Sequence, residues 1–174
     1  RIAELEAFNT GVIHRLTSMF GIITTGAWHL AAQQLQSGWV LSTLPGPNNH
    51  TVEVHRKPWG PALCLVPFNA PAPMAAHKIA NALAAGCPTI LKPSEWAPHG
   101  SDVFAEAAHA AGLPKGVLQI VHGGASVGGQ LVSDARLRAV SFTGSLQGGR
   151  AIAQACAGDF KPAQLDLGGN SAGV

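Results

Sequence analysis

From Ala62 onward, short apolar runs alternate with longer Ala-rich stretches. The apolar runs predict five strands, at 62–66, 89–91, 117–121, 139–142 and 163–167. The stretches between them predict helices near 73–85, 97–111, 127–133 and 148–157. Parallel strands need a crossover of this length, so the alternation indicates βαβ units. Right-handed crossovers then give an α/β fold with a doubly wound (Rossmann-like) parallel sheet and helices on both faces.

The first sixty residues follow another pattern. Apolar side chains recur at helical spacing and predict one amphipathic helix over residues 9–36, packed on protein through Ile13, Leu16, Phe20, Ile23, Ala27, Leu30 and Leu35. Polar residues interrupt this segment, and no run of about 20 apolar residues occurs, which argues against a membrane span. A turn cluster at 45–49 and a strand at 51–55 follow, before a second break at 57–60.

Charge and cysteine content narrow the class of protein. Charged residues make up 11% of the chain and hydrophobic residues 47%, whereas about 25% charged is usual. We therefore expect other protein, a missing part of the chain or a partner subunit, to cover much of the surface. The scattered basic residues and the net charge of +2 argue against nucleic-acid binding. Three cysteines without a CxxC pair indicate reduced, buried thiols.

Polar and glycine-containing segments follow each predicted strand, at 67–69, 92–95, 122–124, 143–145 and 168–169. Ligands of doubly wound sheets bind at these strand ends. The turn at 144–149, GSLQGG, is not GxGxxG, and Arg150 and Ala151 stand where a P-loop needs Lys and Ser/Thr. A strand, a turn and a helix start can still direct backbone N–H groups at a phosphate. The alternative is an ordinary βα turn.

Three residues at these strand ends are candidates for binding or catalysis. Glu95, near Lys92, could accept the hydroxyls of a ribose and would repel a 2′-phosphate, or could stand in a solvated turn near a helix start. Asn69 could donate to a developing oxyanion, or cap the helix expected near residue 73.

His77, His109 and His122 lack metal-ligand spacing, and we expect no metal site.

Taken together, these motifs resemble those of the aldehyde dehydrogenase superfamily. The resemblance rests on VPFNAPAPMAAHKIANALAAGCPTILKPSE, AGLPKGVLQIVHG, VSFTGSLQGGR and LDLGGNS, in the family's order and spacing from Thr51 to Ser171. It implies that residues 61–174 are an NAD(P)-binding Rossmann-like domain cut short before the catalytic domain. Residues 1–60 would be its N-terminal helix and linking strand. Since the first residue is Arg1, we expect an incomplete domain of a larger protein.

The resemblance also implies roles for individual residues. Asn69 would form the side-chain half of an oxyanion hole, and Asp166 stands where the family has a glutamate general base. Gly144 and Gly149 would allow close approach of the cofactor, Phe142 would pack beneath it, and Ser145 would hold the pyrophosphate. Lys92 and Glu95 would hold the adenosine ribose. The remaining cofactor residues would be Val66, Pro67 and Phe68 at the nicotinamide ribose, Ser94 in the ribose turn, and Leu167 beside the nicotinamide.

This chain departs from the family at two points. Asp166 is one methylene shorter than glutamate, a retreat of about 1.5 Å for a group that must reach its water. The family's nucleophilic cysteine lies well after the base, and Cys64, Cys87 and Cys156 all precede it. We therefore expect this piece alone to oxidise no aldehyde.

The expected activity of the parent protein is NAD(P)+-dependent oxidation of an aldehyde to a carboxylic acid through a cysteine thiohemiacetal. Two alternatives stay open: a non-catalytic cofactor-binding relative, and a coenzyme A-acylating relative in which a thiol replaces water. We expect NAD as cofactor, with NADP as the other choice, and an aldehyde as the small-molecule partner. We also expect a cytoplasmic homo-oligomer, a dimer or a tetramer, without nucleic-acid or membrane partners.

Overall fold

A five-stranded parallel sheet with strand order β5-β4-β3-β6-β7 forms the centre of the molecule. The computed structural model describes residues 1–169. The strands are β3 (Ala62–Leu65), β4 (Thr89–Lys92), β5 (Leu118–Ile120), β6 (Ala139–Gly144) and β7 (Ala163–Leu167). The helices that connect them are α3 (Pro71–Ala84), α4 (His99–Ala110), α5 (Ala125–Ser133) and α6 (Leu146–Ala157). The predicted α/β fold and its five strands are confirmed.

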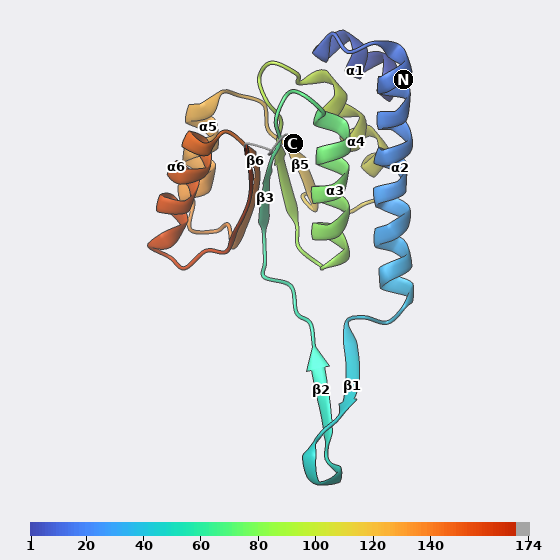
Figure 1. Cartoon of the computed structure of the whole chain (residues 1–174), viewed down its shortest axis with the longest axis vertical. Coiled ribbons are helices and arrows are strands. Elements are labelled where there is room, and N and C mark those ends of the chain that lie inside the picture. The colour runs from blue at the N-terminus through green and yellow to red at the C-terminus, as the bar shows by residue number, and fades with distance from the viewer. Residues whose placement is uncertain (170–174) are drawn as a thin grey trace, which may run out of the picture.

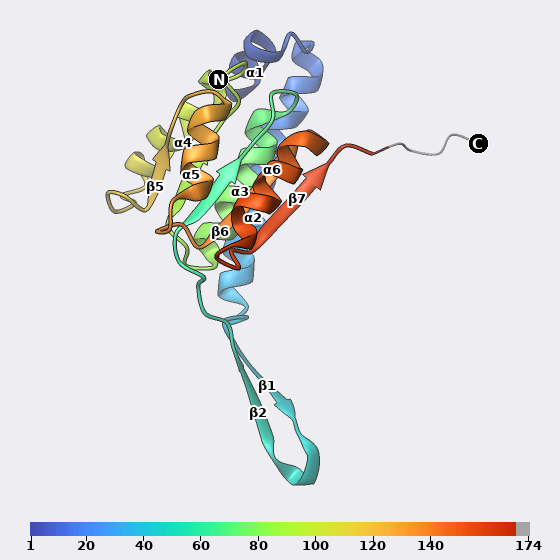
Figure 2. The ribbon, with the colours of Figure 1, turned by 90° about the vertical axis from the view of Figure 1, so that its left-hand side faces the viewer.

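Helices cover both faces of the sheet (Figures 1 and 2). On one face, Cys64 and Val66 of β3 pack with the alanines of α3 and with Phe104 of α4. On the other face, Leu63 and Leu65 pack with side chains of α5 and α6. Because successive side chains of a strand point to opposite faces, a central strand covered on both sides is apolar throughout, as β3 is.

Three helices begin two residues before their predicted starts. The helix α3 begins at Pro71, whose fixed φ and missing N–H suit the first helical position. The helix α6 begins at Leu146 because the Ser145 hydroxyl caps it, accepting a hydrogen bond from the Gly148 N–H at 3.1 Å. The start of α5 moves to Ala125, after Gly124 in extended conformation.

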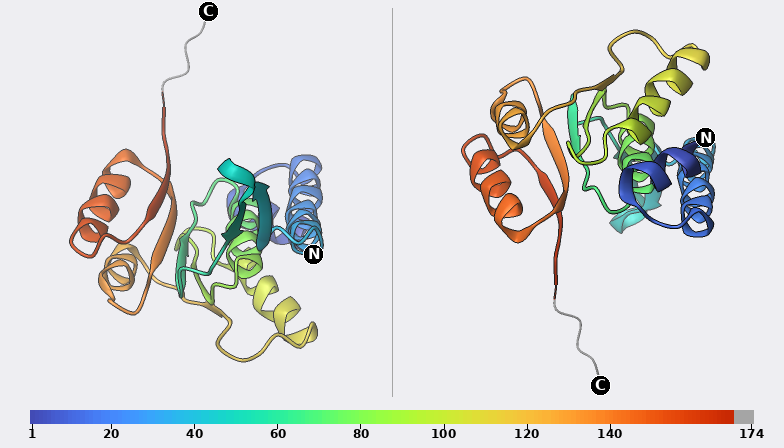
Figure 3. Two further views of the ribbon diagram at one scale, coloured as in Figure 1. Left: turned by 90° about the horizontal axis from the view of Figure 1, so that it is seen from below. Right: turned by 90° about the horizontal axis from the view of Figure 1, so that it is seen from above.

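The single helix predicted for residues 9–36 is wrong. There are two helices, α1 (Ile2–Thr10) and α2 (His14–Gln36), separated at Gly11. Gly11 has φ 69°, a left-handed conformation that ends α1 and that glycine adopts without steric cost. Figure 3 shows α1 lying across the adjacent helices.

The face of α2 that packs on the protein also differs from the prediction. Its buried residues are small ones, Thr17, Thr24, Ala27 and Ala31, and Ala27 joins the core beside α3. Small side chains allow the two helix backbones to approach closely. The larger apolar residues of the predicted stripe are mostly on the outer face, where Ile13, Leu16, Ile23, Leu30 and Leu35 are exposed.

A two-stranded antiparallel hairpin projects from the body of the molecule (Figures 1 and 2). It consists of β1 (Leu41–Pro45) and β2 (Thr51–His55), joined through the short 3-10 helix η1 (Pro47–Asn49). The strand β2 is confirmed at its predicted bounds, whereas β1 was not predicted. Its apolar residues lack regular alternation, and pairing with β2 sets its conformation.

None of the helices in residues 1–169 is long and apolar enough to cross a membrane.

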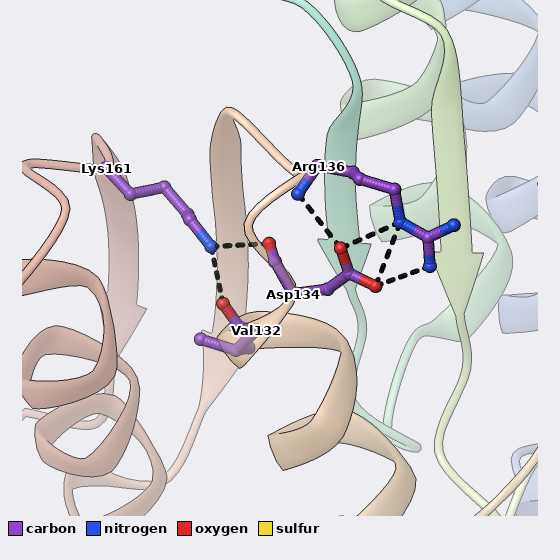
Figure 4. A network of polar contacts seen from close by, with 4 residues as sticks. All are labelled: Val132, Asp134, Arg136 and Lys161. Carbon is purple, nitrogen blue, oxygen red and sulfur yellow. Dashed lines mark hydrogen bonds and ion pairs between the residues drawn. The ribbon is translucent and has the colours of Figure 1, made fainter.

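The buried lysine Lys161 ties the start of β7 to the end of α5. Its ammonium donates to the backbone oxygens of Val132 at 2.6 Å and of Asp134 at 3.0 Å (Figure 4). These carbonyls lie at the C-terminal end of the helix, which leaves its last carbonyls without partners in the helix and favours a cation. The neighbouring Asp134 carboxylate accepts hydrogen bonds from Arg136.

Lys161→Met should lower the free energy of unfolding by about 1.5–3 kcal/mol, because it removes hydrogen bonds from a charged donor to buried carbonyls. Denaturant unfolding measures this change. The exposed Lys115→Met removes the same charge and is the matched control. A Lys161→Met protein as stable as Lys115→Met would show that the buried contact contributes nothing.

Candidate functional site

A cleft of about 480 Å³ opens at the carboxyl ends of β3, β4 and β6, beside α5 and α6. The strand order reverses here: the chain from β3 proceeds through β4 to β5, and then returns to the other side of β3 as β6. Nine of the predicted cofactor residues line the cleft: Val66, Pro67, Phe68, Lys92, Ser94, Glu95, Phe142, Gly144 and Ser145. Segments far apart in the sequence therefore meet at one place.

The two helices contribute lining residues that sequence reasoning missed. Most of these residues are small. The small ones are Ala125, Gly128, Gly129, Gly148, Ala151 and Ala155. The glycine pair inside α5 was a usable signal, because a glycine in a helix often marks a close approach. Trp96 was missed too; it is 72% exposed and its ring lies 5.3 Å from that of Phe68.

Lys92 and Glu95 form a polar pair at the end of β4. The Lys92 ammonium is buried, donates to the Pro93 carbonyl at 2.8 Å and lies 3.9 Å from the Glu95 carboxylate. Burial lowers the pKa of Lys92, and the negative charge of Glu95 opposes that effect. The Glu95 side chain is about half exposed, so its oxygens are open to a ligand. Ser94 accepts a hydrogen bond from the Trp96 N–H at 3.3 Å.

The turn between β6 and α6 rests on an aromatic ring. A Cβ on Gly144 would lie 2.5 Å from the Phe142 ring, and one on Gly148 would lie 2.9 Å from it. Only glycine fits at both places, so the backbone lies directly on Phe142 at the start of α6. Helix N-termini carry free N–H groups and a partial positive charge, which suits an anion.

Gly149 and Leu167 contact each other, and neither residue lines the cleft. A Cβ on Gly149 would meet the Leu167 side chain at 2.5 Å. The missing side chain of Gly149 thus lets α6 pack closely on β7. In this structure the close approach at Gly149 is between helix and strand.

The opposite face of β6 and β7 is polar. Ser141 and Thr143 of β6 pair in register with Gln164 and Asp166 of β7. The Thr143 hydroxyl donates to the Asp166 carboxylate at 3.2 Å, and the Ser141 hydroxyl donates to the Gln164 side-chain oxygen at 2.9 Å. These four residues line a second cavity, of about 580 Å³. Polar side chains at every second position of two strands were the signal for this face.

Lys78 of α3 faces this polar row and was also missed. Its ammonium donates to the Ser141 hydroxyl at 2.7 Å. Burial lowers the pKa of Lys78, while the nearby Cys64 and Asp166 act in the opposite direction. Asp166 therefore lies on the side of the sheet away from the cleft, close to a cation.

Asn69 is exposed at the end of β3 and lines neither cavity. The alternative that Asn69 caps the next helix is wrong. The N-cap residue of α3 is Ala70, whose side chain makes no capping hydrogen bond. The Asn69 amide is thus not engaged in capping α3.

The three cysteines are free and buried. Burial raises the pKa of Cys64 to about 12, although Lys78 lowers it in part. Burial also raises the pKa of Cys156. Since the thiolate is the nucleophilic form, Cys64 and Cys156 are poor nucleophiles at neutral pH. In residues 1–169 no group of three or more His, Cys, Asp or Glu side chains could hold a metal ion.

A doubly wound sheet with a cleft at its switch point, next to a helix N-terminus, is typical of dinucleotide-binding domains. The sequence model of the Aldehyde dehydrogenase family matches residues 1–174. The chain belongs to this family. It is 42% identical over 159 residues to the geranial dehydrogenase of Castellaniella defragrans, covering 82% of this chain and 33% of the relative.

Two further comparisons agree. The glutarate-semialdehyde dehydrogenase of Pseudomonas putida is 42% identical over 132 residues, covering 74% of this chain and 27% of the relative. The crystal structure of an aldehyde dehydrogenase from Brucella melitensis matches with a TM-score of 0.90 and 35% identity, covering 98% of this chain and 35% of that protein. The chain spans about a third of the length of these relatives.

We expect slow alkylation of Cys64, Cys87 and Cys156 in the native protein. With a pKa of about 12, the Cys64 thiolate is populated to about 1 part in 10⁴ at pH 8. Timed iodoacetamide labelling, read by peptide mass spectrometry, should show rates at least about 100-fold below those in denaturant. Fast native labelling of Cys64 or Cys156 would contradict the burial argument and make that thiol a candidate nucleophile.

Proposed function

We propose that the protein containing this chain oxidises an aldehyde to a carboxylic acid with NAD+, and that residues 61–174 form its cofactor-binding unit. The cleft with Glu95 at one side and the start of α6 at the other carries this proposal. A cysteine nucleophile would come from outside the described residues. We also propose a cytoplasmic homo-oligomer, in which other protein covers the exposed apolar side chains of α2.

The residues present fit a dinucleotide. The cleft volume of about 480 Å³ lies in the range of ligand pockets. Glycine and alanine residues on α5 and α6 leave room for a flat ring between the helices. The start of α6, held against Phe142, suits a diphosphate. When bound, the nicotinamide supplies the acceptor for the hydride that leaves the aldehyde carbon.

Glu95 and Lys92 would select and orient the adenosine ribose. The half-exposed Glu95 carboxylate can accept both ribose hydroxyls, and it would repel a 2′-phosphate. Lys92 has donors left beyond its bond to the Pro93 carbonyl and can bind a hydroxyl as well. Among the structural neighbours, PnpE was solved with nicotinamide adenine dinucleotide and a 3,6-anhydro-L-galactose dehydrogenase with NAP.

Asn69 and Asp166 would serve the reacting carbonyl. The amide of Asn69, exposed at the end of β3, can donate to the oxyanion that develops when the nucleophile attacks. The Asp166 carboxylate keeps one oxygen beyond its bond from Thr143 and can remove a proton from the attacking water. The negative charge of Asp166 in turn opposes the lowering of the Lys78 pKa by burial.

A coenzyme A-acylating activity is the second candidate, and the short side chain at Asp166 favours it. A base that reaches poorly for water matters less when a thiol takes the acyl group. Product analysis with and without coenzyme A separates the two: the proposed hydrolysis gives free acid in its absence. A non-catalytic relative would give neither product.

Glu95→Ser should shift the ratio of kcat/KM for NAD+ over NADP+ toward NADP+ by about tenfold or more, which corresponds to about 1.4 kcal/mol. The reason is the loss of a negative charge where a 2′-phosphate would bind. Glu53→Ser, on the exposed hairpin, removes an equal charge and should leave the ratio unchanged. A wild-type preference for NADP+ would refute the assignment of Glu95.

Asp166→Asn should lower the steady rate of acid formation by about 10²-fold or more, as expected for loss of a general base. The first turnover of NADH should persist as a burst, because hydride transfer precedes deacylation. Stopped-flow absorbance at the NADH band separates the two phases. Asp159→Asn, at an exposed turn, makes the same charge change and is the control. An unchanged steady rate in Asp166→Asn would remove Asp166 from the mechanism.

A further inference from the structure

Glu6 is a fully buried carboxylate on α1, far from the cleft in sequence. Its exposed fraction is 0%. One oxygen accepts a hydrogen bond from the backbone N–H of Ala72 at 3.2 Å. Within residues 1–169 the other oxygen is buried without a hydrogen-bond partner, and so are the Asn9 amide nitrogen and the Ser101 hydroxyl. Burying a carboxylate is costly unless the fold compensates its charge.

Two helix starts converge on this carboxylate. The helix α3 has Ala70 as its N-cap and α4 has Pro98, and neither residue offers a side-chain cap. Ala72, in the first turn of α3, donates to Glu6. On the α4 side, a Cβ on Gly100 would lie 2.2 Å from the free Glu6 oxygen. The Glu6 carboxylate thus stands where both helices leave N–H groups and partial positive charge.

Each of these two helices begins shortly after a candidate site residue. The helix α3 begins at Pro71, two residues after Asn69. The helix α4 begins at His99, four residues after Glu95. A contact that fixes the first turns of α3 and α4 therefore limits how far the segment that carries Asn69 can move relative to the turn that carries Glu95. A second contact, the ion pair of Arg1 with Glu106, holds α1 on α4.

We propose that Glu6 is a positioning residue that locks the starts of α3 and α4 together and so sets the placement of Asn69 and Glu95. The catalytic consequence rests on the proposed function, whereas the structural lock does not. Burial raises the pKa of Glu6 to about 7, and the Ala72 N–H opposes this shift. A neutral glutamine should therefore serve in its place, because its side-chain oxygen can still accept from Ala72.

The test compares four single variants and one double variant of the full-length protein. Glu6→Leu keeps the side-chain bulk and removes the acceptor, and Glu6→Gln keeps the acceptor. Gly100→Ala pushes the carboxylate away from the α4 side. Glu4→Leu, on the exposed side of the same helix, is the control. The readouts are kcat, KM for NAD+, and hydrogen–deuterium exchange of peptides covering residues 69–76 and 93–102, with 163–167 as internal reference.

Glu6→Leu and Gly100→Ala should each raise the exchange of both peptides, lower kcat about tenfold or more and raise KM for NAD+ several-fold, since misplacing a catalytic group by about 1 Å can cost 10²-fold. Glu6→Gln should stay within about twofold of wild type, as should Glu4→Leu. In a Glu6→Leu background, Gly100→Ala should have little further effect, because contacting residues are not additive.

Faster exchange with unchanged kcat and KM in Glu6→Leu would overturn the positioning role and leave Glu6 a structural residue. If Glu6→Leu does not fold, Gly100→Ala decides, and normal kcat, KM and exchange in that variant would likewise overturn the proposal. A wild-type protein without aldehyde oxidation would count against the proposed function only. The exchange of residues 69–76 would then still decide whether Glu6 locks the start of α3.

Discussion

The parallel pairing of β3 with β4 on one side and β6 on the other is the constraint on which the site depends. It brings the carboxyl ends of three strands to one edge and, because the chain reverses its direction of travel along the sheet at β3, leaves a crevice between the helices of the two halves. The apolar residues of β3 make this position possible, since both of its faces are buried.

The sheet separates two environments that meet at one residue. On the side of α5 and α6, small side chains and Phe142 shape the cleft proposed for the cofactor. On the side of α3, a row of hydroxyl, amide and carboxylate groups faces Lys78. Thr143 lines both cavities and donates to Asp166. Alternation along β6 and β7 therefore places the proposed cofactor-binding residues and the proposed base Asp166 on opposite faces of the sheet, near the same strand ends.

The sequence predicts most of the sheet, because its short apolar strands and Ala-rich helices leave a regular pattern. It also predicts most of the cleft, since strand ends of a parallel sheet must gather at one edge. The break at Gly11 has a local signal, a glycine at the end of a helix, and β1 takes its conformation from the neighbouring strand β2. The buried Thr and Ala face of α2 depends on packing with distant segments and leaves no local pattern. Lys78, Trp96 and Glu6 escape prediction for the same reason: each is defined by contacts across the fold.

A crystal structure of the full-length protein with NAD+ would show whether this cleft holds the cofactor. We expect the adenosine ribose hydroxyls within about 3.2 Å of the Glu95 carboxylate and the diphosphate at the start of α6. We also expect Asp166 on the other face of the sheet from the adenosine. A nucleotide bound elsewhere, or one in the cleft with Glu95 turned away from its ribose, would show that the cleft is not the cofactor site proposed for it.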